Sequence, residues 1–473
     1  MPFKRYKQRG DKWYVYEITS FWDKTLKKSR QRSKYLGVAI EPGGSYSKID
    51  SLPACSILKE QAIVDFGDSY TIFEITKQSG LSSIITQSLG HSDSIMALLC
   101  FQMTEGAAMM HAADWLEGNI AKQLFPKAKL HSQAISQLLQ HLGEESIQQS
   151  FFKAYASKFF QGKHGVLIDS TALPNAINSS LNAFGYSSDG ILQKVSCLML
   201  VDKQTKLPLY FRAIPGDIAD VSTIDTTLKE IKQLGISVGE VILDAGYFSE
   251  ANVKSLCQAD IDFVSRMPKS RKVFQNLVQQ AGVMETHAQA VLYGKRLVFI
   301  KSQEITLYGQ KLFAHVILDP HKKAKDLNLL LAEAFEDSKP ESDINDSMKI
   351  CGYFILISRK NISLTEILPT YYARQSIEQV FGFAKSCLGA LPLRVHSDQS
   401  VRGYLLLVFL ALVIFITIRQ KLQPHYTAEC ALMVLRSLKA KTFDSAIVIQ
   451  EPSKKVKSIF KYLGVIVPTE LGI

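Results

Sequence analysis

The sequence has little that would suit a disulfide-linked, zinc-binding or secreted protein. Its seven cysteines are scattered from Cys55 to Cys430, and no two of them form a C-x-x-C pair. An odd number of dispersed cysteines argues against a disulfide framework and a zinc ribbon, and it favours a reducing compartment. The N-terminus is basic and aromatic and lacks the apolar stretch of a signal peptide. We therefore expect a cytoplasmic protein.

The sequence also lacks an apolar run long enough to cross a membrane, and it has no internal repeat. Its longest candidate, "YLLLVFLALVIFITI" at residues 404–418, is 15 residues long. A helix needs about 20 apolar residues to span a bilayer. We predict that this run is a buried helix of a globular protein and that no membrane is a partner.

Acidic residues are in short supply, with 44 Asp and Glu against 55 Lys and Arg, which gives a net charge of +11. The first 34 residues hold 11 of the basic residues and three of the acidic ones, so most of the excess lies there. Such a balance suits a polyanion such as nucleic acid. "WYVYEI" alternates like a strand and "KSRQRSKYLGVAI" can pair with it. A basic arm over residues 1–50 could contact phosphates, or it could be a solvated edge hairpin whose charges prevent aggregation.

The rest of the 473 residues divides into regions of different hydrophobic periodicity, and the length allows two or three domains. Apolar residues at spacings of three and four predict helices over 51–160. Strand-like and helical segments then alternate, which predicts a mixed α/β sheet in two parts, at 161–269 and 351–420. Residues 270–350 interrupt this rhythm and read as a β-rich insertion. We expect a helical tail over 421–473.

Two apolar runs end in an aspartate followed by small residues. They are "VLIDST", with Asp169, and "VILDAG", with Asp244. Buried strands of an α/β sheet have this pattern, and ligands gather beyond their carboxyl ends. "SCLMLVD" ends in Asp202, but "KQTK" and another strand follow at once. That is the chemistry of a hairpin turn, so we interpret Asp202 as structural.

The segment "YYARQSIEQVFGFAK", residues 371–385, has an unusual distribution of polar groups. On a regular helix Tyr371, Arg374, Glu378 and Lys385 would share a stripe about 60° wide along the edge of the apolar face. A helix that lines a cleft has this pattern. An ion pair between Arg374 and Glu378, four residues apart, would explain part of it without any function.

A carboxylate cluster formed by the two aspartates and Glu378 would need compensation, because unpaired acids repel one another. Hard divalent cations supply it, since Mg²⁺ prefers carboxylates together with substrate phosphate oxygens. Two such ions would activate water or a 3′-hydroxyl on one side of a phosphodiester and stabilise the leaving oxygen on the other. Arg374 and Lys385 would then bind phosphates of the same strand.

These motifs together resemble the DDE transposases of bacterial insertion sequences, in the branch with a Y-x2-R-x3-E-x6-K signature. The signature corresponds here to Tyr371, Arg374, Glu378 and Lys385. The aspartate motifs are "LIDST" and "LDAGYFS", and the stretch "YFRAIPGDIADVST" between them also resembles the family. The resemblance covers about residues 160 to 420 and includes the long gap before Glu378, where the family has a β-rich insertion.

The resemblance implies an RNase H-like catalytic core with a β-rich insertion and a mostly helical N-terminal region. It implies that Asp169, Asp244 and Glu378 are catalytic and hold two Mg²⁺ or Mn²⁺ ions. It also implies that Tyr371, Arg374 and Lys385 contact transposon-end DNA. The implied reaction is cleavage at the ends of the element, followed by attack of the 3′-hydroxyl on target DNA. The implied assembly is a homodimer on double-stranded DNA, in a bacterial nucleoid.

Three other functions remain open at this stage. An RNase H-like metal-dependent nuclease would cut DNA without joining strands. A domesticated transposase kept as a non-catalytic regulator would bind DNA only. A metallohydrolase of small phosphoesters would fit the acids but not the basic N-terminal residues. Arg394 and Arg402 are candidate phosphate contacts or solvated charges, and His164 and His396 are expected to be surface or capping residues.

Overall fold

The computed structural model describes residues 2–9, 12–23, 26–39, 41–47, 60–187, 190–218, 220–336, 341–443 and 446–472. The chain forms two compact units. The smaller comprises residues 1–62, 441–448 and 470–473, and the larger comprises residues 63–440 and 449–469. All the residues of the predicted site lie in the larger unit.

The smaller unit begins with an antiparallel sheet of four strands in the order β1-β2-β3-β4. The strands are Phe3–Arg9, Lys12–Asp23, Lys28–Ala39 and Tyr46–Ser47. β2 and β3 are the arms of the predicted hairpin, and Tyr14 of β2 lies opposite Val38 of β3. Val15 and Ile18 are buried, whereas nearly all of β1 and the first eight residues of β3 are exposed. The basic side chains of β1 and β3 therefore face solvent.

The C-terminal region was expected to be a helical tail, and the structure shows that it also contains strands. Its helices are α16 (Ala428–Leu435) and α17 (Lys454–Leu463), and its strands are β16 (Lys439–Phe443), β17 (Ala446–Ile449) and β18 (Glu470–Gly472). With β5 (Glu60–Asp65) these strands form a sheet in the order β18-β17-β16-β5. The partner strand comes from the other end of the chain, so local sequence patterns do not reveal the pairing.

The region expected to be helical starts with residues 51–59, which lie outside the described residues, and with the strand β5. From Gly67 onwards it is mostly helical and lies in the larger unit. Its helices are α1 (Gly67–Ser79), α2 (Leu81–Ser88), α3 (Ser92–Thr104), the 3₁₀ turn η1 (Met109–His111), α4 (Ala112–Glu117), α5 (Ala121–Leu124), α6 (Ser132–Leu142) and α7 (Glu145–Phe159). The aromatic residues of α7 belong to the core, since Phe151, Phe152 and Tyr155 all pack around Phe409 of α15 (Asp398–Leu422).

A ten-stranded mixed sheet forms the body of the larger unit, in the order β12-β13-β14-β15-β11-β10-β6-β8-β7, with β9 paired to β8. Its first part consists of β6 (Lys163–Pro174), β7 (Ala183–Ser187), β8 (Gly190–Asp202), β9 (Pro208–Pro215), β10 (Ser237–Leu243) and β11 (Asp262–Arg266). β6, β10 and β11 are parallel, whereas β8 is antiparallel to β6 and to β9. Buried apolar runs such as Val166–Ile168 fit strands that are covered on both faces.

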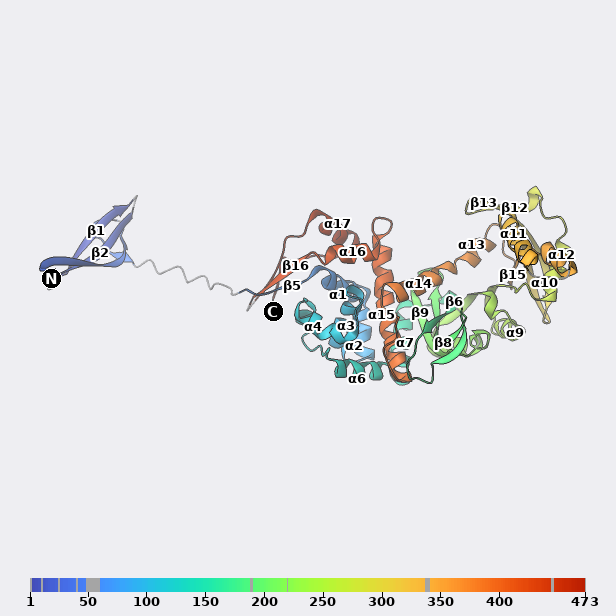
Figure 1. The fold of residues 1–473 in the computed structure, drawn as a ribbon. Coiled ribbons are helices and arrows are strands. Elements are labelled where there is room, and N and C mark those ends of the chain that lie inside the picture. Colours follow the sequence, from blue (N-terminus) through green and yellow to red (C-terminus); the bar gives the residue numbers. More distant parts are fainter. Residues whose placement is uncertain are drawn as a thin grey trace. The chain divides into compact units, whose positions relative to one another are not determined.

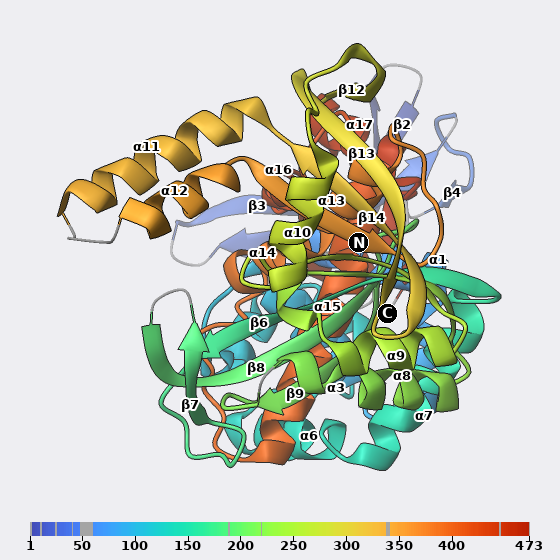
Figure 2. The same ribbon diagram turned by 90° about the vertical axis from the view of Figure 1, so that its right-hand side faces the viewer.

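Helices join and cover these strands. The 3₁₀ turn η2 (Asp220–Ser222) and α8 (Ile224–Gln233) connect β9 to β10, while η3 (Ala245–Tyr247) and α9 (Glu250–Gln258) connect β10 to β11. α13 (Ile367–Tyr372) and α14 (Gln375–Ser386) follow the last strand, and α14 packs against β6 and β8. Figures 1 and 2 show α15 and α9 on opposite sides of β6 and β8.

The segment expected to be a β-rich insertion contains more helix than strand. Its elements are α10 (Lys272–Ala281), η4 (His287–Gln289), β12 (Ala290–Tyr293), β13 (Arg296–Leu307), β14 (Gln310–Leu318), α11 (Pro320–Glu336) and α12 (Glu341–Lys349). Figure 2 shows the long pair β13 and β14, with α11 and α12 side by side next to it. β14 pairs with β15 (Tyr353–Ser358), which pairs with β11, so the insertion extends the core sheet.

Helix α15 contains the apolar run at 404–418. In the described part of the chain it is the one helix long and apolar enough to cross a membrane, and 89% of its most apolar window is buried in the protein. Figure 1 shows it between the helices α1–α4 on one side and the strands β8 and β9 on the other. It therefore packs as the buried core helix that the sequence predicts.

The close contact between α15 and α6 predicts a large effect of one methyl group. A Cβ added at Gly403 would lie 1.9 Å from the carbonyl oxygen of Leu139. We expect Gly403→Ala to lower the free energy of unfolding by about 1–3 kcal/mol, since the backbones would have to separate. Urea unfolding followed by circular dichroism measures this change. Gly382→Ala in α14 is the control. There a Cβ meets nothing within 4 Å, so the same substitution should stabilise by roughly 0.5–1 kcal/mol. Equal effects at the two positions would contradict the packing.

Candidate active site

The register of β6 and β10 brings Asp169 and Asp244 side by side. Ile242 of β10 pairs with Leu167 of β6 in parallel. Each aspartate lies two residues further along its strand, so the two occupy equivalent positions and point to the same face. Asp244 follows the end of β10, as predicted. Asp169 does not end its strand, because β6 continues to Pro174 by pairing with β8; only its pairing with β10 ends near Asp169.

The signature segment was predicted as one regular helix, and the structure shows a break within it. α13 ends at Tyr372 and α14 begins at Gln375. Across the break the backbone forms i→i+3 hydrogen bonds, from Arg374 N–H to Tyr371 O and from Ile377 N–H to Arg374 O. This tighter turn changes the angle between Tyr371 and Glu378, so the simple helical wheel does not describe their directions.

The guanidinium of Arg374 joins all three acids. Its Nη1 lies 3.2 Å from Asp169 Oδ2 and 3.5 Å from Asp244 Oδ2. Its Nη2 lies 2.9 Å from Glu378 Oε1. Both aspartate oxygens lie within 3.5 Å of the same nitrogen, Arg374 Nη1, so the two carboxylates lie close to each other. The structure thus contains both the local ion pair considered from the sequence and the convergence of three distant acids.

Tyr371 lies beside this cluster and orients one of its members. Its hydroxyl donates a hydrogen bond of 3.1 Å to Asp244 Oδ1. Burial, and next the negative charge of Asp244, raise the pKa of Tyr371, so the phenol stays protonated as a donor. Burial would lower the pKa of Arg374, but Asp244 and the other acids raise it overall. Arg374 is therefore a permanent cation at the centre of the site.

Lys385, the last residue of the signature, lies in the final turn of α14. Its charge acts on Cys197 of β8, where burial raises the thiol pKa to about 12 and Lys385 works in the opposite direction. Lys385 thus lies over the β8 side of the core strands. Its predicted role in binding DNA is not tested by these contacts.

The donor set suits a hard divalent cation. In the described residues, no three His, Cys, Asp or Glu side chains are arranged as a metal site. The three acids are instead spaced around the Arg374 guanidinium. Their oxygens nevertheless converge on one positive group, and carboxylate oxygens are the ligands that Mg²⁺ and Mn²⁺ take. The residues present therefore fit such an ion once Arg374 moves away.

The sequence reasoning missed Arg266. Ser265 of β11 pairs with Leu243 of β10, so Arg266, the next residue, lies level with Asp244 at the same edge of the sheet. The sequence "IDFVSRMP", residues 261–268, contains β11, which ends at the charged residue Arg266. The same end-of-strand rule could have selected Arg266.

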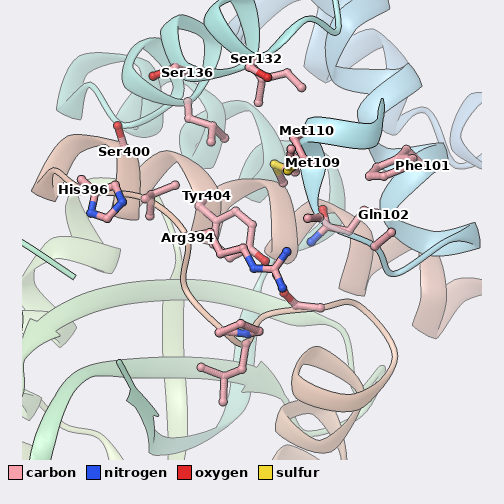
Figure 3. Close-up of a pocket in the computed structure, with 18 of the residues that line it drawn as sticks. Phe101, Gln102, Met109, Met110, Ser132, Ser136, Arg394, His396, Ser400 and Tyr404 are labelled. Carbon is pink, nitrogen blue, oxygen red and sulfur yellow. The ribbon is translucent and has the colours of Figure 1, made fainter. Parts of the chain in front are cut away.

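The other residues considered from the sequence lie elsewhere. Asp202 Oδ2 accepts hydrogen bonds from the backbone and hydroxyl of Thr205, and its Oδ1 lies 2.9 Å from His164 Nδ1, so both residues stabilise the turn after β8. Arg394 and His396 line a cavity of about 380 Å³ between α3, α6 and α15, with Gln102 and Tyr404 on its walls (Figure 3).

A comparison with protein families identifies the class of this chain. Residues 161–414 match the model of the Transposase DDE domain family. This match spans more than half of the 473 residues, and the chain therefore belongs to the DDE transposase family.

The other comparisons add little. No curated protein matches the chain. Among solved structures, the chain is similar to a piggyBac transposase, seen by cryo-electron microscopy in a synaptic complex with hairpin DNA. The two share 11% identity over 78% of this chain and 77% of that one, with a TM-score of 0.43. That likeness is too low to support conclusions about this site.

The shared cation predicts a specific loss of stability. Arg374→Gln leaves three acids without their common partner, and we expect it to lower the free energy of unfolding in EDTA by about 1–3 kcal/mol. The matched control is Arg359→Gln, which breaks pairs with Asp260 and Asp262 and should cost less than about 1 kcal/mol. Urea titrations of both variants measure the difference. An Arg374→Gln protein as stable as wild type would contradict the central role of this guanidinium.

Proposed function

We propose that this protein is the transposase of an insertion sequence. It binds the terminal inverted repeats and catalyses metal-dependent DNA cleavage and strand transfer. The observation that carries this proposal is the convergence of Asp169, Asp244 and Glu378 on one guanidinium. All three belong to the segment that matches the family.

The strands around the site support an RNase H-like core. β8 pairs in an antiparallel way with β6 and with β9, and β10 and β11 continue the sheet on the other side of β6, in parallel with it. In such a sheet Asp169 and Asp244 lie side by side, just beyond the last paired residues of β6 and β10. α14 packs on β6 and adds the third acid from outside the sheet.

Asp169, Asp244 and Glu378 would hold two Mg²⁺ or Mn²⁺ ions. When bound, these ions would activate water or a 3′-hydroxyl and stabilise the leaving oxygen of a phosphodiester. The chain prepares the site for them in two ways. Tyr371 fixes the orientation of Asp244 through its hydroxyl. Arg374 compensates the negative charge beforehand, so the acids can stay close together.

Arg374 would exchange its carboxylate partners for a phosphate. Its planar guanidinium suits either group, because both accept two parallel hydrogen bonds. Once it is released from the acids, it remains next to them and can bind the DNA strand that enters. Lys385 on α14 and the Tyr371 hydroxyl would contact the same transposon-end DNA. The site would thus keep its positive charge both without DNA, when Arg374 binds the acids, and with DNA, when Arg374 binds a phosphate.

The basic sheet β1–β4 would contact DNA through its exposed strands. Lys4, Arg5, Lys7 and Arg9 alternate with aromatic and polar residues along β1, and Lys7 lies over the ring of Tyr16. Such a surface suits phosphate contacts along a duplex. A homodimer bridging the two ends of the element, in a bacterial nucleoid, completes the proposal.

Removal of one acid should separate catalysis from binding. We expect Glu378→Gln to reduce cleavage of DNA carrying the ends of the element by roughly 10³-fold or more, with DNA affinity largely kept. Gel analysis of labelled ends in Mg²⁺ measures cleavage, and fluorescence anisotropy measures binding. A strand-transfer assay with pre-cut ends distinguishes a transposase, which inserts them into a plasmid, from a nuclease. Full cleavage by Glu378→Gln would show that the site is wrongly assigned.

If Arg374 competes with the metal ion for the three acids, removing its charge should increase the affinity for the ion. In the wild type the ion must displace the guanidinium, which lowers the apparent affinity by the fraction of protein in the open state. We expect Arg374→Gln to bind Mn²⁺ roughly tenfold more tightly, as measured by calorimetry without DNA. Asp244→Asn, the control, should weaken binding. Weaker Mn²⁺ binding by Arg374→Gln would indicate that the arginine supports the ion and does not compete with it.

A further inference from the structure

A second basic feature lies directly behind Tyr371. A cavity of about 390 Å³ is formed where β11, β13, α11, β15 and α13 meet. Its wall consists of Arg266, Arg296, Asp319, His321, Lys322, Lys325, Asp326, Phe354, Tyr371 and Tyr372. We refer to it as the basic pocket. The core sheet and the insertion both contribute to it, and none of its residues belongs to the family signature except Tyr371.

The basic pocket contains more positive than negative charge. Arg296 lies 3.5 Å from Asp319, and Asp326 is engaged by Lys269, just outside the pocket, at 3.2 Å. The remaining cations are Arg266, Lys322 and Lys325. Within the described part of the chain, none of these three forms an ion pair with a carboxylate. Three cations of the wall are thus available for an anion.

Two of these cations lie near the same aromatic ring. The guanidinium of Arg266 lies 5.6 Å from the centre of the Phe354 ring, and the ammonium of Lys322 lies 5.9 Å from it. Burial, and next the charge of Arg266, lower the pKa of Lys322. Like charges that a fold holds together in this way repel each other, and an anion between them would relieve the repulsion.

The pocket adjoins the acid cluster through Tyr371. The hydroxyl of Tyr371 donates to Asp244, while its ring belongs to the pocket wall. Arg266 lies level with Asp244 on the neighbouring parallel strand. A DNA strand whose scissile phosphate lies on the acids would therefore continue over Tyr371 towards the pocket.

We propose that the basic pocket binds a phosphate group of the cleaved DNA strand, next to the scissile phosphodiester. A phosphate offers several strong acceptor oxygens, which match the separate donors of Arg266, Lys322 and Lys325. Tyr372, which is partly exposed, provides apolar surface for the attached sugar. This inference rests on the proposed function for the identity of the strand. It assigns DNA-contacting residues outside the Y-x2-R-x3-E-x6-K signature.

Salt dependence tests the pocket without any need for cleavage. The affinity of the full-length protein for a fluorescein-labelled DNA duplex is measured by anisotropy between about 50 and 200 mM salt. We expect Lys322→Ala to weaken binding roughly tenfold and to reduce the slope of log K against log salt by about one. Arg266→Ala should have the same effect. Lys229→Ala is the control, because Lys229 is exposed on α8 and already pairs with Asp225.

A variant that is expected to tighten DNA binding separates the effect of the pocket from misfolding, because a misfolded protein would bind more weakly. Asp326→Asn removes negative charge from the pocket wall while keeping an oxygen that can accept the hydrogen bond from Gly352 N–H. We expect it to tighten DNA binding. The inference is overturned if Lys322→Ala shows the same slope as wild type and Lys229→Ala, or if Asp326→Asn fails to tighten binding.

Neutral methylphosphonates identify the phosphate that enters the pocket. Each is placed singly along the strand that the protein cuts. At the phosphate bound by the pocket, the substitution should weaken binding of wild type but not of Lys322→Ala. The inference is overturned if no methylphosphonate near the cut on the cleaved strand weakens binding of wild type more than binding of Lys322→Ala. If wild type cuts DNA but pocket variants bind normally, only this inference fails. If it cuts none in Mg²⁺ or Mn²⁺, the proposed function fails.

Discussion

The arrangement of the site depends on the shared positive charge of Arg374. Three carboxylates from three separate elements would repel one another if they were brought together alone. The guanidinium joins Asp169, Asp244 and Glu378, and the strands β6 and β10 hold two of them at one level. Because Arg374 lies between α13 and α14 and Glu378 lies in the first turn of α14, the break between these helices sets the position of the cation.

This constraint links folding to chemistry. On the proposed function, the three acids would hold divalent ions, and Arg374 supplies a cation of the chain's own before the ions bind. The same guanidinium is suited to phosphate, so it keeps a partner when metal and DNA enter. Tyr371 connects this cluster to the basic pocket, where Arg266, Lys322 and Lys325 hold further positive charge. On the proposed function, both features would contact the same anionic strand.

Much of the core could be predicted from local patterns. The apolar runs before Asp169 and Asp244 indicated two buried strands, and the basic hairpin and the buried helix at 404–418 were recognisable by their periodicity. The pairing between strands that are distant in the sequence could not be predicted in this way. The continuation of β6 beyond Asp169 depends on β8, the strands β16–β18 depend on one another and on β5, and the insertion joins the core through β14 and β15. The turn at Arg374 and the position of Arg266 depend on such tertiary contacts as well. The catalytic and DNA-binding roles of these residues stay predictions.

A crystal structure of the protein soaked in Mn²⁺ tests the central claim most directly, since manganese is located by its anomalous scattering. The account predicts anomalous peaks coordinated by the carboxylates of Asp169, Asp244 and Glu378, with the Arg374 guanidinium displaced from all three. A saturated crystal with no such peak, in which Arg374 still joins the acids, would contradict it.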